Sequence, residues 1–384
     1  MNNNDYNSQN QNGEKEEIRF DETDFRNPYS EYYREPQGNG FGADFKVYEE
    51  PSYATAPLID EAKVKNHFST IGMGYALFAA ISFAASLVIQ IIVYLINPEF
   101  YESTLFLNIV TPASLYLFAL PVLLIVLSRC EAKAPEKKKM SFKAFILFLI
   151  TAFGFMYIGA MIGNSVMDAI SNLVGYDYSN GLQNIIDYDN LWITAIFTVI
   201  VAPIGEEFVF RKLIIDRTQK YGGLVSIGLS GLMFGLMHGN LYQFFYCFAL
   251  GLLLGYIYYS TGKLYITIAI HAIVNFVGSI LSSLLVPVSE AMDAIDPNDM
   301  GAYLEFVEAN IGPLLGLVAF SLFTYAAMAC AVIFPIVFRK KLQIRPGEVA
   351  IPKGKIMSVV ILNVGIIVMI TLYLLEFGLN LLPL

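Results

Sequence analysis

Long apolar stretches recur along this 384-residue chain from Ile71 to its C-terminal end, and they restrict the possible folds more than any other feature. Hydrophobic residues make up 56% of the chain and charged residues only 15%, which lies well outside the composition of soluble domains. A helix needs about 20 apolar residues to cross the hydrocarbon core of a bilayer. The sequence therefore predicts a multi-pass membrane protein.

Nine stretches approach this length, although the fifth and sixth are short. Because the apolar runs are continuous rather than alternating, and because backbone polar groups cannot stay unpaired in lipid, we expect helices and not barrel strands. The predicted fold is all-α, a polytopic membrane helical bundle of eight or nine transmembrane helices. The predicted ranges are 71–96, 105–127, 144–166, 191–215, 224–241, 244–259, 265–285, 311–338 and 356–378.

The lysines and arginines predict how this bundle is oriented. All seventeen that follow residue 66 lie at or after the ends of even-numbered helices, whereas the opposite connections contain acidic residues and neither lysine nor arginine. Short cytoplasmic loops collect positive charge. We therefore expect a cell-membrane protein with a cytoplasmic N-terminus, surrounded by the lipid bilayer and without a nucleic-acid partner.

Residues 1–66 differ in character from the rest of the chain. They hold 14 acidic and 7 basic residues and open with the Asn/Gln-rich segment "MNNNDYNSQNQNGEKEE". Such a composition cannot bury enough apolar surface to fold alone. The predicted organisation is a disordered acidic cytoplasmic tail over residues 1–66 and a multi-pass membrane domain over residues 67–384.

Very few ionisable residues fall inside the predicted membrane helices. A central charge costs on the order of 2.5–3.5 kcal/mol to insert, so each one needs a partner or a function. Glu207 and Arg211 are spaced i and i+4 with the acid first, which favours an ion pair on one helix face. The neighbouring Glu206 is rotated by about 100° and is left without a partner on its own helix. Two histidines, His238 and His271, also lie within these predicted helices.

Spacing places further polar and small residues on defined faces. His271 and Asn275 are i and i+4 on the seventh helix, so their side chains point the same way. Gly231, Gly235 and Gly239 recur every fourth residue, which predicts close approach of a neighbouring helix. Taken singly, each polar residue has a structural alternative, as an interhelical hydrogen-bond partner or as a side chain that reaches the membrane interface. Together, Glu, two His and Asn can activate a water and hold an oxyanion.

Three segments of the chain resemble the motifs of a known family. "EEFVFR" at 206–211, "FGLMH" at 234–238 and "HAIVN" at 271–275 are similar to the EExxxR, FxxxH and HxxxN signatures of the CPBP intramembrane proteases. These are the CaaX-processing and bacteriocin-processing glutamic endopeptidases, related to the Ras-converting enzymes. The motifs occur in the right order on successive helices, and a protease-like core is expected at about residues 191–285.

The resemblance implies an intramembrane peptidase, a hydrolase that acts on a peptide bond of a membrane-associated or lipidated protein or peptide. It implies that Glu206 and His238 activate a water, that His271 and Asn275 form the oxyanion hole, and that Glu207 and Arg211 support the site. Family members were earlier regarded as metalloproteases, and a zinc ion held by Glu and His is conceivable. The chain has no HExxH helix and the carboxylate route needs no metal, so no cofactor is expected.

Two functions from other classes compete with the peptidase. A proton-coupled transporter also buries Glu and His, but it usually shows repeated halves, and the three motifs have no second copy. A catalytically silent membrane scaffold or bacteriocin-immunity factor on the same fold is the stronger alternative, because motifs report capability rather than use.

The predicted helix ends leave one geometric problem. At about 1.5 Å per residue from the cytoplasmic helix ends, Glu206 and His271 lie roughly 10–14 Å deep but His238 lies roughly 20 Å deep. We therefore expect the fifth helix to tilt or to begin late, after Gly222 and Gly223.

Overall fold

The computed structural model of the chain describes residues 60–176, 178, 191–281, 283–296 and 298–382. These residues form helices and their connections, and no strand occurs among them, which confirms the all-α fold. Seven helical runs are long and apolar enough to cross a membrane, and two shorter apolar helices accompany them. The protein is a multi-pass helical membrane protein.

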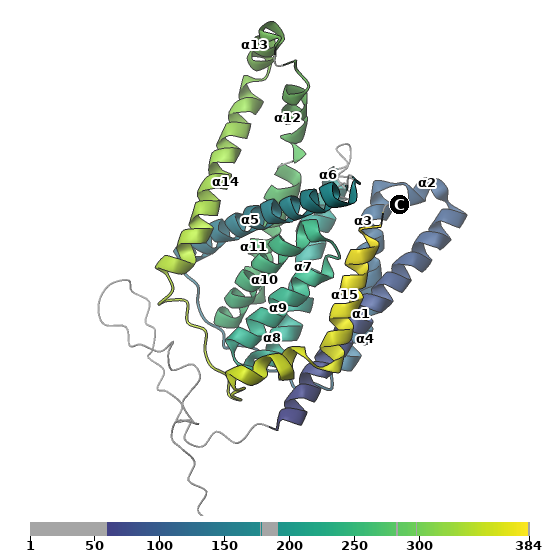
Figure 1. Cartoon of the computed structure of the whole chain (residues 1–384), viewed down its shortest axis with the longest axis vertical. Helices are drawn as coiled ribbons and strands as arrows, with labels where there is room; N and C mark the ends of the chain where they lie inside the picture. Colours follow the sequence, from purple (N-terminus) through teal and green to yellow (C-terminus); the bar gives the residue numbers. More distant parts are fainter. Residues whose placement is uncertain (1–59, 177, 179–190, 282, 297, 383–384) are drawn as a thin grey trace, which may run out of the picture. The chain divides into compact units, whose positions relative to one another are not determined.

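The first half of the described chain contains four long or interrupted helices and the short α2 (Figure 1). Short π-helical segments, labelled η, interrupt two of them. The elements are α1 (Glu61–Ile96), α2 (Pro98–Tyr101), α3 (Thr104–Ala113), η4 (Ser114–Ala119), α4 (Leu120–Leu127), α5 (Phe142–Val174), α6 (Leu191–Ala195), η7 (Ile196–Val201), α7 (Ala202–Glu206), η8 (Glu207–Lys212) and α8 (Leu213–Thr218).

The second half begins at a 3₁₀ turn, η9 (Gln219–Tyr221), which ends the run that started at Leu191. The elements that follow are α9 (Gly223–Met237), α10 (Leu241–Thr261), α11 (Leu264–Asn275), η10 (Phe276–Leu281), α12 (Val286–Asp293), α13 (Met300–Ala309), α14 (Ile311–Val337), η11 (Lys353–Lys355), η12 (Met357–Ile361) and α15 (Val364–Leu379).

The structure changes several of the predicted boundaries. The first helix begins at Glu61, because Asp60 accepts a hydrogen bond from the Lys63 amide and caps it. Residues 61–66 are therefore helical, and residues 1–59 of the predicted disordered tail lie outside the described residues. The ninth helix is divided at Asn363, whose side chain caps α15. The connection after residue 285 is not only a loop, since it contains α12 and α13.

Five packing relationships organise the bundle. The α10 helix packs against both α9 and α5, α14 packs against α5, and α1 packs against α15 and α4 (Figure 1). A Cβ atom at Gly231 or Gly235 would contact α10 side chains within about 3 Å, at Leu252 and Phe248 respectively. The predicted close approach of a neighbouring helix is thus confirmed for these two glycines.

A tight helical hairpin connects the Leu191–Tyr221 run to α9. Its turn is at Gly222, whose φ of +103° is accessible to glycine but strained for other residues. The loop before η11 holds this turn from outside, because Gly223 donates its amide to Arg345 O at 3.0 Å and Val349 donates to Lys220 O at 2.8 Å. The two helices of the hairpin carry the first two sequence motifs.

Candidate active site

The hairpin brings the first two motifs to the same level. Glu206 precedes Gly222 by 16 residues and His238 follows it by 16 residues, so two antiparallel helices place them at equal distances from the turn. The prediction of a late start for the fifth helix is wrong, since α9 begins at Gly223. The difference in depth between Glu206 and His238 disappears because the preceding helix continues to Tyr221, beyond the predicted end at Ile215.

A buried ion pair lies at the start of η8. The Glu207 Oε1 and Arg211 Nη2 atoms are 3.0 Å apart and both side chains are fully buried, which confirms the predicted i, i+4 pair. The Arg211 guanidinium carbon also lies 4.2 Å from the centroid of the Phe234 ring, a cation–π contact. Because a buried charge without a partner is very unfavourable, these contacts hold η8 against α9.

His271 lies between the two adjacent carboxylates. Its Nδ1 is 2.9 Å from Oε1 of Glu207, and its Nε2 is 3.7 Å from Oε2 of Glu206. A carboxylate oxygen accepts a hydrogen bond, so Nδ1 carries a proton and Nε2 faces Glu206. Glu207 therefore orients His271 as well as pairing with Arg211, a contact from another helix that its own spacing could not reveal.

Glu206 differs from its neighbour in being accessible. Its side chain is 15% exposed, whereas that of Glu207 is 0% exposed. Among the described residues it accepts no hydrogen bond, and its carboxylate is within electrostatic range of His238 and Tyr116. Glu206 thus keeps lone pairs that can bind a water, as expected of a carboxylate without a partner on its own helix.

His238 follows the last residue of α9 instead of lying within a helix as predicted. Gly239, with φ of +67°, ends the helix there. The Nδ1 atom of His238 is 2.9 Å from Phe234 O. Since a carbonyl only accepts, Nδ1 is the donor, and in the neutral ring Nε2 is an acceptor. This tautomer suits a group that receives a proton from water.

The Phe234 ring contacts three groups of the site. Its centroid lies 5.0 Å from that of His238 and 5.7 Å from that of His271, both nearly perpendicular, and Arg211 lies over its face. Phe234 is the first residue of the FxxxH motif, but the sequence analysis predicted no role for it. Its position four residues before His238 on one helix was the available signal.

Asn275 has a partner that the sequence did not predict. Its Nδ2 donates to Thr198 O at 2.9 Å, a carbonyl within η7. Two carbonyls of η8 are satisfied similarly, Val209 O by the Tyr75 hydroxyl at 2.5 Å and Phe210 O by the Ser230 hydroxyl at 2.8 Å. A π-helical turn shifts the backbone hydrogen bonds, and in a membrane each freed carbonyl needs a new donor. One amide hydrogen of Asn275 is thus used to satisfy a backbone carbonyl.

Tyr116 of η4 is a second residue that the sequence did not reveal. Its ring lies against Gly205, where any Cβ atom would overlap it. The absence of a side chain at Gly205 admits this ring next to the residue that precedes Glu206.

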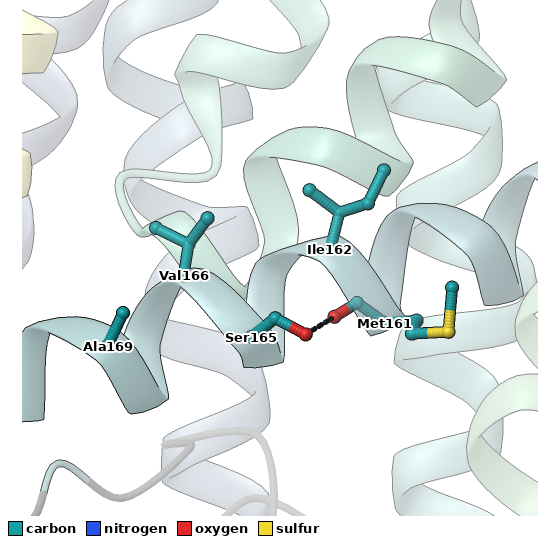
Figure 2. Close-up of a pocket in the computed structure, with 5 residues that line it drawn as sticks. All are labelled: Met161, Ile162, Ser165, Val166 and Ala169. Carbon is teal, nitrogen blue, oxygen red and sulfur yellow. Dashed lines mark hydrogen bonds between the residues drawn. The ribbon is translucent and has the colours of Figure 1, made fainter.

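No metal centre accompanies these residues within the described part of the chain. No group of three or more His, Cys, Asp or Glu side chains there is arranged to hold a metal ion. One shallow pocket lies on α5 (Figure 2), and the residues lining it include no ionisable side chain. Its one hydrogen bond joins the Ser165 hydroxyl to Met161 O on the same helix, so it is a surface depression unrelated to Glu206.

Comparison with known proteins identifies a segment that is similar to a known family. Residues 188–277 match a family model described as type II CAAX prenyl endopeptidase Rce1-like. No curated protein and no solved structure matches the chain. The matched range spans all three motifs, from the Glu206 helix to Asn275, and excludes α1–α5 and α12–α15.

Proposed function

We propose that this protein is an intramembrane endopeptidase in which Glu206 activates a water to hydrolyse a peptide bond of a membrane-associated or lipidated protein or peptide. The Rce1-like family is a protease family, which supports a hydrolase. The observation that carries the proposal is the environment of the Glu206 carboxylate. It is a partly exposed carboxylate without a hydrogen bond among the described residues, and it faces His271 at 3.7 Å.

The reaction begins with removal of a proton from water. Glu206 accepts this proton while the water oxygen adds to the scissile carbonyl carbon, and His238 accepts a hydrogen bond from the same water through Nε2. The proton held by Glu206 is then given to the amide nitrogen as the C–N bond breaks. The products are a carboxylate and an amine, and no metal takes part in these steps.

The oxyanion formed on the carbonyl requires donors on the opposite side of the reacting carbon. We assign this role to His271 and Asn275. The Nδ1 hydrogen of His271 is donated to Glu207, so Nε2 donates to the oxyanion only when the ring carries both protons. Glu207 fixes the orientation of this ring, and Arg211 holds Glu207 in place. The second amide hydrogen of Asn275 completes the site.

The distribution of lysine and arginine supports the remaining part of the proposal, which concerns location. We place the protein in the cell membrane with its N-terminus in the cytoplasm. The Gly222 turn, which follows Lys220, then faces the cytoplasm.

The experiment compares the new peptide N-termini in membranes from cells carrying the wild-type protein or Glu206→Gln. The variant keeps the size and hydrogen bonding of the side chain and removes the proton acceptor. We expect a set of termini present only with the wild type. Identical sets, at equal protein levels, would contradict the peptidase and favour the catalytically silent scaffold.

A further inference from the structure

The last helix of the chain contacts the turn that carries His238. Asn380, which follows the end of α15, donates from Nδ2 to Gly239 O at 2.8 Å, across 141 positions of sequence. The α15 helix lies outside the Rce1-like range of 188–277. A residue beyond the three motifs is therefore hydrogen-bonded to the peptide next to His238.

The turn itself offers no other partner for this carbonyl. The carbonyl of His238 accepts from Asn240 Nδ2 at 2.8 Å, and the Gly239 amide donates to Leu236 O at 3.1 Å. The carbonyl oxygen of Gly239 instead accepts its hydrogen bond from Asn380, at the end of α15. A Cβ atom at Gly239 would lie 2.7 Å from Oε1 of Glu376 on the same helix, so α15 also restricts this position sterically.

The α15 helix is well fixed at its other end. Gly365 donates its amide to the Ser69 hydroxyl of α1 at 3.0 Å, and a Cβ atom at either Gly72 or Gly365 would overlap the opposing backbone. The α1 helix in turn donates from Tyr75 to Val209 O, in the π-helical segment that begins directly after Glu206. The packed pair α1 and α15 thus contributes hydrogen bonds to the segment directly after Glu206 and to the turn directly after His238.

We propose that Asn380 is a positioning residue, which holds the Gly239 peptide so that the His238 ring stays at a fixed distance from Glu206. This inference rests on the proposed function and deepens it. The hydrogen bond acts on the backbone immediately after His238, at the point where the chain leaves α9. Without it the turn can rotate about Gly239, the one residue there that is free to adopt many backbone conformations.

The test compares Asn380→Asp, which keeps the size but removes the donor, with Asn380→Gln, which keeps an amide. The control is Leu379→Ala, since Leu379 is 52% exposed and adjacent in sequence. The probe is the peptide whose new N-terminus depends most on Glu206, synthesised with a fluorophore and quencher. We expect kcat of Asn380→Asp to fall roughly 3- to 10-fold with an unchanged KM, as for loss of one hydrogen bond, and Asn380→Gln to recover part of it.

A second measurement does not depend on a substrate. Amide hydrogen exchange over residues 234–245, followed by mass spectrometry, should be faster in Asn380→Asp than in the wild type and unchanged in Leu379→Ala. Wild-type kcat and exchange in Asn380→Asp would overturn the inference. If no Glu206-dependent cleavage exists at all, the proposed function fails instead, and the exchange rates alone decide whether α15 holds the turn.

Discussion

Two acidic centres lie ten residues apart on one helix of this protein and differ in how completely their groups are paired. Near the Gly222 turn, Asp216 accepts from the Tyr258 hydroxyl at 2.8 Å and pairs with Lys212 at 3.1 Å, while its backbone carbonyl accepts from the Lys133 amide at 2.7 Å. Glu206 has none of these contacts. A fully paired carboxylate stabilises the fold, whereas one left open inside a membrane protein is suited to chemistry.

The difference is sharpened by Glu207, which lies beside Glu206 in sequence but resembles Asp216 in its pairing. Arg211 and His271 both contact its Oε1 atom. Adjacent positions on a helix point in directions about 100° apart, so one acid faces the protein interior and the other the accessible side. If pairing distinguishes these acids, substitution of a paired acid lowers stability, whereas substitution of Glu206 lowers activity.

The largest expected effect is the loss of cleavage in Glu206→Gln. Since the carboxylate accepts no hydrogen bond among the described residues, we expect a protein that inserts and melts like the wild type but does not hydrolyse peptide bonds. Melting in detergent and release of the probe peptide measure the two properties. Retained cleavage would show that the open acid is not the proton acceptor.

Glu207→Gln should lower the stability of the protein more than its activity. Breaking a buried ion pair by removing one partner typically costs about 3–5 kcal/mol, because Arg211 is left as an unpaired charge. We expect a markedly lower Tm in detergent, and reduced but measurable cleavage by the molecules that fold. A variant with wild-type Tm and no activity would mean that the roles of the two acids are reversed.

The donors of the proposed oxyanion hole come next. His271→Ala and Asn275→Ala should each lower turnover roughly 10²- to 10³-fold with little change in KM, as when a donor is removed from other oxyanion holes. Asn275→Ala should also lower Tm, because Thr198 O loses its donor. Near-normal turnover in Asn275→Ala would reduce its role to this packing contact.

Asp216→Ala provides the matched test of the paired centre. It leaves the buried Tyr258 hydroxyl without its acceptor, which should cost about 1–3 kcal/mol of stability. The kcat of the folded protein should not change. A loss of kcat comparable to that of the oxyanion-hole variants would show that the two centres are coupled.

The smallest effect is expected for Lys133→Ala, at an exposed ion pair with Glu348. The hydrogen bond from Lys133 to Glu348 raises the pKa of this lysine, so the pair stabilises the fold below the ordinary lysine pKa and the contribution is lost as pH rises through the raised value. Exposed pairs contribute little, and the Lys133 backbone amide still reaches Asp216 O in the variant. The shift in Tm at neutral pH should be smaller than in Asp216→Ala and should vanish at strongly alkaline pH.

The sequence alone was sufficient for the all-α membrane fold, for each of the nine apolar helices within a few residues at most ends, and for the Glu207–Arg211 pair. The length of an apolar run and i, i+4 spacing are properties of a single helix. They can therefore be predicted without knowing how the helices pack against one another. The end of the Glu206 helix was predicted too early, because its last turns contain Asp216 and Arg217 and no longer look apolar.

Contacts between helices were decided only by the tertiary structure. The bonds from Glu207 to His271, from Asn275 to Thr198 and from Asn380 to Gly239 join residues 64, 77 and 141 positions apart. No local spacing encodes such pairs, since they depend on where each helix ends and on π-helical turns that rotate the following residues. The sequence therefore determined which polar groups enter the membrane, and packing decided which of them stay unpaired, because a hydrogen bond needs both groups in one place.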